Sequence, residues 1–277
     1  LIWLAEHTVR DKPGEEQDLS MPVLDERLLT SPAVAIQQAQ NAVEKMAARA
    51  ARNYRAAMPL LAGYKDDAAA VVNQREDLID RMEVTLTNYL IKISDRELGE
   101  MESHRANSLL AFVTEVERIG DYAINVTERA AEMRDKELTF SDQAQRELQM
   151  LGNAIGEIID LTVQAMHSGD AATAAQVEPL EETVDTICET LRTRHIQRLK
   201  EGKCQLESGI TFLDVLTNLE RISDHCSNSA ARLLGMESDS ELDPHALKKA
   251  MHNGNTKGYD DALNQYRKKY SQVLAEG

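Results

Sequence analysis

Residues that build turns, strands and covalent cross-links are scarce in this chain. Its 277 residues include only 13 glycines, 6 prolines and 3 cysteines, and aromatic residues make up 4%. This scarcity argues against a β-sandwich, a barrel or a doubly wound sheet, and it favours long helices. No apolar run approaches the roughly 18 residues that a membrane-spanning helix needs, and we find no signal-peptide pattern.

The cysteines and the charge narrow the expected partners. Cys188, Cys204 and Cys226 are widely spaced and form no Cys-x-x-Cys pair, which is typical of reduced thiols in a cytosolic protein. The formal net charge of −16 repels phosphate backbones, so we expect no nucleic acid as a partner, whereas metal cations and basic proteins are attracted.

The chain starts at Leu1 and is apolar up to Leu4, so we expect it to be cut from a longer protein.

Apolar periodicity and helix-capping residues predict six long helices and a final helical region. The expected helices span about 31–61, 66–93, 95–135, 141–169, 170–202 and 205–234, and the last region follows Pro244. Helices of this length joined by short turns fold back as antiparallel neighbours. The predicted fold is therefore all-α, with two tandem three-helix bundles and a C-terminal helical extension. We divide the chain into a lead-in or linker (1–30), a first repeat (31–136), a second repeat (141–236) and the extension (237–277).

The two halves of the helical region are related in sequence. Residues 114–129 and 217–232 are identical at seven of sixteen positions. The preceding helices also correspond, because acidic and apolar positions of residues 72–86 match those of residues 177–191. We interpret the chain as two copies of one three-helix unit.

Four Glu-x-x-x-Asp pairs occupy equivalent places in the two copies. They are Glu76/Asp80, Glu117/Asp121, Glu181/Asp185 and Glu220/Asp224. Residues four apart share one helix face, roughly 6 Å from each other. These acids continue apolar stripes that face inward, and the small residues Gly120 and Ser223 lie beside them. Acids on an inward face are costly unless they are paired or bind a metal.

Two explanations of this pattern remain open from the residues alone. A cluster of carboxylates, with Asn125 and Asn228 as further oxygen donors, would suit several hard cations such as magnesium, manganese or ferric iron. Alternatively, Arg118 and Arg221 would pair with the acids in a buried salt-bridge network. No Glu-x-x-His or His-Glu-x-x-His pair, phosphate-binding glycine loop or nucleophile elbow occurs, so the residues predict no enzyme of those classes.

The doubled motif resembles the signature of PhoU domains. The resemblance is carried by residues 117–125 and 219–228, together with the acids at 76–80 and 181–185, and it covers about residues 31–236. It implies two three-helix repeats that bind multinuclear metal clusters and help to control phosphate uptake, without catalysis. The metal could be iron, manganese, magnesium or zinc. Carried over by motif, the implied ligands are Glu76, Asp80, Glu117, Asp121, Glu181, Asp185, Glu220 and Asp224, with Asn125 and Asn228 in support.

Further features resemble one branch, the PhoU-like cytosolic tail of bacterial sodium-dependent phosphate cotransporters. These are residues 24–29 before Ser31-Pro32, residues 195–199 with Gly202 and Cys204, and the helical C-terminal region. This resemblance implies a regulatory domain on the cytoplasmic side of the inner membrane. Its partner would be a transmembrane phosphate-transport domain of the same polypeptide.

Three alternatives stand beside that expectation. The first is a free-standing PhoU regulator of an ABC-type phosphate transporter and a sensor kinase. The second is a carboxylate-bridged di-metal enzyme such as a hydrolase, and the third is a helical scaffold whose acids only form salt bridges. In addition, an apolar stripe in the C-terminal region predicts either a homodimer or intramolecular docking. Its members are Ala262, Leu263, Tyr266, Tyr270 and Leu274.

Overall fold

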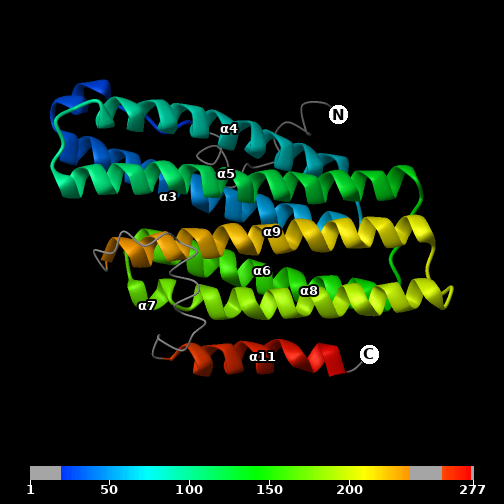
Figure 1. Cartoon of the computed structure of the whole chain (residues 1–277). Coiled ribbons are helices and arrows are strands. Elements are labelled where there is room, and N and C mark those ends of the chain that lie inside the picture. Colours follow the sequence, from blue (N-terminus) through cyan, green and yellow to red (C-terminus); the bar gives the residue numbers. More distant parts are fainter. Residues whose placement is uncertain (1–19, 238–257, 276–277) are drawn as a thin grey trace, which may run out of the picture.

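The computed structural model describes residues 20–237 and 258–275, with side chains described for 20–235 and 258–271. In this part of the chain there is no strand, and long helices dominate (Figure 1). They are η1 (Glu26–Thr30), α3 (Pro32–Ala57), η2 (Met58–Leu61), α4 (Asp66–Ser94), α5 (Glu100–Asp135), α6 (Asp142–Ser168), α7 (Ala171–Ala174), α8 (Val177–Lys200), α9 (Leu206–Glu237) and α11 (Tyr259–Ala275). None of the described helices is both long and apolar enough to span a membrane.

Local sequence signals explain where several helices begin and end. Pro32 opens α3 at the first helical position, where its missing N–H costs nothing. The Ser141 side chain caps α6 by accepting a hydrogen bond from the Ala144 N–H. Gly169 ends α6 with φ of 66°, a left-handed conformation that glycine adopts without strain.

The helices form two groups of three, as the internal repeat predicts. In the first group α3, α4 and α5 pack on one another, and in the second α6, α8 and α9 do so. The groups meet mainly where α5 lies beside α9 in the middle of the molecule, and also where α3 contacts α6 (Figure 1). The predicted all-α fold of tandem three-helix bundles with a helical extension is confirmed.

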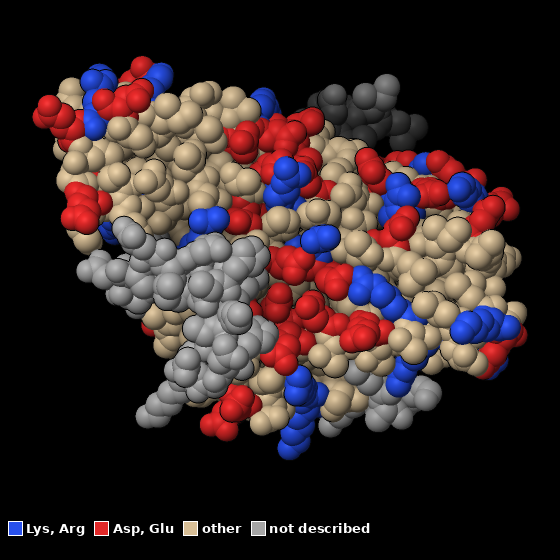
Figure 2. All heavy atoms as spheres, in the orientation of Figure 1, with Lys and Arg blue, Asp and Glu red and all other residues tan. Residues whose placement is uncertain are grey.

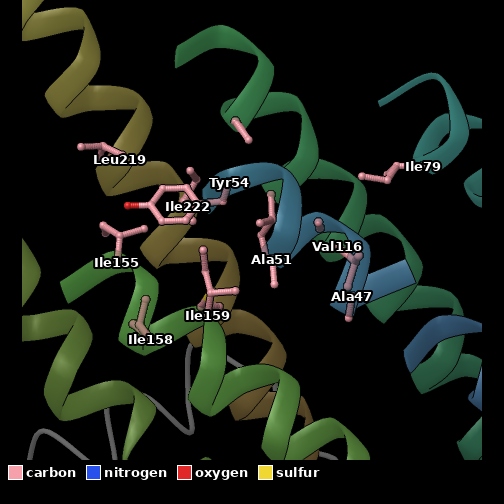
Figure 3. Packing of buried hydrophobic residues seen from close by; sticks show 14 of the residues in the cluster. Ala47, Ala51, Tyr54, Ile79, Val116, Ile155, Ile158, Ile159, Leu219 and Ile222 are labelled. Atoms are coloured by element: carbon pink, nitrogen blue, oxygen red, sulfur yellow. The ribbon is translucent and has the colours of Figure 1, made fainter. Parts of the chain in front are cut away.

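One hydrophobic cluster runs through both repeats, so they share a core. At the junction, Tyr54 and Ala51 of α3 lie among Ile155 and Ile159 of α6 and Ile222 of α9 (Figure 3). The Tyr54 hydroxyl donates a hydrogen bond of 2.8 Å to the carbonyl oxygen of Gly152. A polar group of a buried tyrosine is thereby satisfied, and the two repeats are tied together.

Three boundaries differ from the sequence prediction, each for a local reason. The lead-in contains η1, because Asp25 caps it and Leu29 enters the core. The third long helix starts at Glu100 because the N–H of Gly99 bonds to the Glu102 carboxylate at 3.1 Å. The fifth predicted helix is divided into α7 and α8, and Pro179 lies in the first turn of α8, where proline is tolerated.

The C-terminal extension docks on its own chain. Helix α11 packs against α8 and α6, below α8 in Figure 1. Of the predicted stripe, Ala262, Leu263 and Tyr270 are buried and Tyr266 packs partly buried against the core. Tyr259, which the prediction does not include, is buried as well. Intramolecular docking, one of the two outcomes expected from this stripe, is therefore observed. The Leu274 side chain and the predicted helix start at Pro244 lie outside the described residues.

Candidate metal centres

The first acid cluster, which comprises Glu76, Asp80, Glu117 and Asp121, lies between α4 and α5. One carboxylate oxygen from each of Glu76, Asp80 and Asp121 lies within 4.8 Å of the others. Glu117 lies close enough to Asp121 for the two carboxylates to interact electrostatically, which joins the fourth acid to this group. Four carboxylates predicted from spacing alone are thus brought together by the packing of two helices.

Burial makes the first acid cluster electrostatically unfavourable when all its acids are ionised. Glu76 is only 8% exposed, and this burial together with Asp80, Asp121 and Glu117 raises its pKa to about 8. Burial and the neighbouring Asp121 also raise the pKa of Glu117 to about 7. The Asn53 amide donates a hydrogen bond of 3.4 Å to one oxygen of Glu76. The other oxygen, Oε1, is buried and accepts no hydrogen bond from the described residues.

Gly120 leaves the space that the Glu76 carboxylate occupies. A Cβ atom at position 120 would lie 2.9 Å from Oε2 and 3.3 Å from Oε1 of Glu76. The absence of a side chain on α5 therefore allows the buried carboxylate of α4 to lie against the α5 backbone. In the second repeat the equivalent residue is Ser223, which is fully buried and has a hydroxyl without a hydrogen bond to the described residues.

The second acid cluster, which comprises Glu181, Asp185, Glu220 and Asp224, lies between α8 and α9. Carboxylate oxygens of Glu181, Asp185 and Asp224 again come within 4.8 Å of one another. The two triads are at equivalent positions of the repeat, and acidic side chains gather over α8 and α9 and again over α4 (Figure 2). Both triads therefore follow from the same three-helix architecture.

The fourth acid of the second cluster, Glu220, has a basic partner on the neighbouring helix. Glu220 forms a two-pronged ion pair with Arg192 of α8, one of whose hydrogen bonds measures 3.2 Å. The sequence prediction missed Arg192, although it lies seven residues after Asp185 on the same helix face. The equivalent residue of the first repeat is Thr87. The second cluster thus gains an ion pair across α8 and α9 that the first repeat does not have between α4 and α5.

The two arginines of the repeated motif lie at the outer edge of the clusters. Arg118 is 3.4 Å from Asp121 and 3.6 Å from Glu117, and Arg221 is 3.4 Å from Asp224. Both guanidinium groups are more than half exposed, so their charge is screened by water. Neither arginine is paired with Glu76, the acid whose ionised form is most disfavoured by burial. Salt bridges to these arginines therefore compensate the charge of acids at the exposed edge of the clusters. They do not compensate the charge of the buried acids.

The two asparagines predicted as supporting ligands face the boundary between α5 and α9. Asn228 donates a hydrogen bond of 3.3 Å to Glu115 of α5, which also contacts His225 at 2.8 Å. Asn125 lines a cavity of about 250 Å³ together with Asp214 of α9. Both residues therefore have surroundings that suit a contact between the repeats, and their part in metal binding stays a prediction.

A family model described as the PhoU domain matches residues 43–130 and 148–233, the two regions that carry the acid clusters. The chain belongs to the PhoU domain family. A PhoU homolog of Thermotoga maritima, named as a phosphate-specific transport system accessory protein, is 20% identical over 72% of this chain and 86% of its own length. A homolog of the same name from Pseudomonas aeruginosa is 25% identical over 58% of this chain and 66% of its own.

Solved PhoU structures share the fold. The crystal structure of PhoU from Pseudomonas aeruginosa superposes with a TM-score of 0.70 at 21% identity, covering 76% of this chain and all of its own. The PhoU structure from Streptococcus pneumoniae gives 0.68 at 15% identity, covering 77% of this chain and all of its own. The PhoU family is a regulatory accessory family, in agreement with the resemblance noted in the sequence.

The expectation of a sodium-dependent cotransporter tail is wrong, and with it the expected transmembrane partner in the same polypeptide. The named relatives are accessory proteins of phosphate-specific transport systems. The residues that suggested the cotransporter branch have structural roles here. Leu29 is buried in the core, His195 stacks on Phe212, and Gly202 takes a left-handed conformation after α8. Packing and helix termination explain these residues without a transport domain.

Proposed function

We propose that this PhoU-family chain is a regulatory accessory protein of an ABC-type phosphate transport system, acting at the cytoplasmic side of the inner membrane. In this proposal both acid clusters hold multinuclear metal sites. The transport role is supported by the names of its relatives. The metal sites are supported by one observation above all, the repetition of a close carboxylate triad between equivalent helices.

The donor set fits a hard cation. All atoms offered by the triads are carboxylate oxygens, the ligands that magnesium, manganese and ferric iron prefer. In the first cluster Oε1 of Glu76 is buried and accepts no hydrogen bond from the described residues. A bound cation would neutralise this carboxylate and link α4 to α5, as its counterpart would link α8 to α9. The metal supplies charge and cross-linking, while the helices supply the surface that a partner recognises.

Metal analysis of purified variants tests the sites directly. We expect Asp80→Asn with Asp121→Asn to remove the metal of the first cluster, because two of its three close carboxylates become neutral. Asp185→Asn with Asp224→Asn should do the same for the second, and the combination of all four should leave no bound metal. Elemental analysis by mass spectrometry measures the content, with circular dichroism as the check on helicity.

Exposed acids of the same helices provide matched controls. Asp67→Asn on α4 and Glu189→Gln on α8 remove one charge each outside the clusters, so the metal content should equal that of the wild type. Equal metal content in the wild type and the quadruple variant would refute the metal sites.

The regulatory role is tested separately in cells. In a phosphate-transporting bacterium that lacks its own PhoU protein, this chain should restore the limitation of phosphate uptake in phosphate-rich medium. The quadruple variant should fail to do so if the clusters shape the regulatory surface. Uptake that is unaffected by the wild-type chain would contradict the accessory role while leaving the metal result standing.

Gly120→Ala should weaken the first metal site without unfolding the chain. The new methyl group would meet the flexible ends of two side chains, the carboxylate of Glu76 at 2.9 Å and Cδ1 of Ile79 at 3.3 Å, so that the carboxylate moves and the helix backbones stay in place. We expect about a tenfold loss of affinity at the first cluster, the lower end of what disturbed ligand orientation costs. Titration with manganese, followed by calorimetry, measures the affinity. Ser223→Ala, the matched change in the second repeat, should leave the first cluster unchanged.

We assign the chain a non-enzymatic role, and the di-metal enzyme is the rival. A groove of about 1280 Å³ lies between α3, η2, α6 and the end of α11, and no acid of either cluster lines it. The clusters therefore do not open into this groove, where a substrate would be enclosed. Turnover of phosphate esters by the metal-loaded wild type, lost in the quadruple variant, would overturn the assignment.

A further inference from the structure

Helix α11 is an addition to a fold that is complete without it. The PhoU match ends at residue 233, and the whole Pseudomonas aeruginosa structure is matched by 76% of this chain. In the described part of the chain, no helix lies on α4 as α11 lies on the equivalent α8 (Figure 1). The residue equivalent to Glu182 in the first repeat is Asp77, which is exposed.

Two carboxylates of the α6/α8 face hold α11 through polar contacts. Glu182 of α8 accepts hydrogen bonds from the Tyr259 hydroxyl at 2.6 Å and from Arg267 at 2.8 Å. Glu157 of α6 accepts one from Lys269 at 2.7 Å and another from the Tyr270 hydroxyl. Each carboxylate thus accepts hydrogen bonds from one tyrosine hydroxyl and from one basic side chain. Hydrogen bonds to an ionised carboxylate are stronger than those between neutral groups, so these four contacts position α11 on the face.

The apolar part of the contact consists of a few residues on one face of α11. Tyr259 and Leu263 form a separate cluster with Leu234 of α9, and Tyr270 reaches the main core. Only 20 residues connect α9 to Gly258, which keeps the helix near its face. A connection of this length gives an effective concentration of roughly 1 mM. Even an intrinsic dissociation constant of about 100 µM would therefore keep α11 docked about 90% of the time.

We propose that the α6/α8 face is a docking surface for an amphipathic helix of a partner protein, and that α11 occupies this face as a displaceable cap. The chemistry of α11 defines the partner helix, which carries a tyrosine and leucine stripe flanked by arginine or lysine. Charge complementarity favours a basic helix, because the anchors Glu157 and Glu182 are acidic and the whole chain carries −16. The cap and the partner compete for the same carboxylates.

A labelled peptide tests this competition on the full chain. The probe is a fluorescein peptide with the sequence of residues 258–277, and fluorescence anisotropy measures its binding. Tyr259→Ala with Leu263→Ala in the protein should undock α11 and leave the face intact. We expect the peptide to bind this variant at least tenfold more tightly than the wild type, since the tethered helix no longer competes.

Further variants separate the proposal from its rivals. Arg267→Glu with Lys269→Glu in the protein should also undock α11 while its apolar contacts remain, which guards against a folding defect of the first variant. Adding Glu157→Gln and Glu182→Gln should abolish peptide binding, and a peptide with both basic residues reversed should not bind. Hydrogen exchange of residues 260–271 in the wild type should be faster than that of α6 and α8.

Three results would overturn the proposal. Failure of the peptide to bind either undocked variant would make α11 a fixed part of the fold. Equal binding to the wild type and to the undocked variants would place the peptide on another surface. A wild-type dimer in analytical ultracentrifugation, lost in the undocked variants, would show that α11 instead docks on a second copy.

Discussion

In the presence of a chelator the protein should lose stability as the pH rises from about 5 to about 8. The residue that carries this effect is Glu76, whose pKa is raised from the ordinary 4.5 to about 8 by burial and by the acids around it. Between these values the folded state keeps a proton that the unfolded state has released. The contribution of Glu76 to stability is therefore complete below about pH 4.5 and falls with rising pH until Glu76 ionises in the folded state.

The expected loss is on the order of several kcal/mol, since each pH unit between the two pKa values costs about 1.4 kcal/mol. Glu117 acts in the same direction, because its pKa is raised to about 7. Its side chain is 22% exposed, so water weakens its share. The sign is opposite to that of the usual ion-paired carboxylate, which stabilises a protein as the pH rises.

The effect can be measured by urea unfolding at pH 5 and at pH 8, with chelator in both samples. If the slope of the unfolding free energy against urea concentration is the same at both pH values, a lower midpoint concentration at pH 8 reports the loss of stability. Glu76→Gln should remove most of the pH dependence, because glutamine carries no charge at either pH and can still accept the hydrogen bond of Asn53. Glu189→Gln, an exposed acid of α8, should retain the wild-type dependence. A wild type equally stable at both values would show that Glu76 is ionised in the folded protein without cost.

Adding metal should reverse the loss at pH 8 and change little at pH 5. A cation that binds only the folded state stabilises that state by mass action. The cation binds only when the carboxylates are ionised, so it binds more weakly at low pH. Metal and protons therefore compete for the first acid cluster. This competition connects the metal proposal to a stability measurement that does not depend on any partner.

The acid clusters were predictable because helix geometry and internal repetition act together. Spacing of four places Glu76 and Asp80 on one face, and the apolar stripe fixes which way that face points. Asp121 had to lie opposite them once the two helices were antiparallel neighbours. Repetition of this arrangement 103 to 105 residues later distinguished it from the many acid pairs that chance produces.

What the sequence left open concerns contacts between distant positions. Arg192 and Glu220 are 28 residues apart on different helices, and only the angle between α8 and α9 lets the guanidinium reach the carboxylate. Asn125 and Asn228 share a helix face with the acids by spacing, yet the crossing of α5 and α9 gives them neighbours in the other repeat. The stripe of α11 was visible, but nothing in its periodicity says which surface it covers.

Arg198→Met should strongly destabilise the second repeat. Arg198 of α8 donates hydrogen bonds of 2.9 and 2.7 Å to the two carboxylate oxygens of Glu147 of α6, and their side chains are only 10% and 3% exposed. The substitution leaves a buried carboxylate with Arg194 at 3.9 Å as its nearest basic group. Removing one partner of a buried pair costs about 3–5 kcal/mol.

The same geometry predicts that the loss is recovered by a second substitution. Arg198→Met combined with Glu147→Leu removes both charges, and the apolar pair lies beside Phe212, on whose ring His195 stacks with centroids 4.3 Å apart. Replacing a buried ion pair by apolar residues of similar volume is often neutral or stabilising, so the double variant should regain most of the lost stability. A double-mutant cycle in urea would then give a large coupling energy.

The exposed pair Arg55 and Asp160 is a control that shows how much of the expected loss of stability is due to burial of the ion pair. Their side chains are 47% and 60% exposed, and Arg55→Met should change the unfolding free energy by less than about 1 kcal/mol. The contrast isolates the cost of leaving Glu147 charged inside the protein, because both pairs join an arginine to an acid across two helices. If Arg198→Met were as mild as Arg55→Met, leaving Glu147 without its buried arginine would cost the folded protein little. The buried pair would then be a source of orientation for α6 against α8, without being a source of stability.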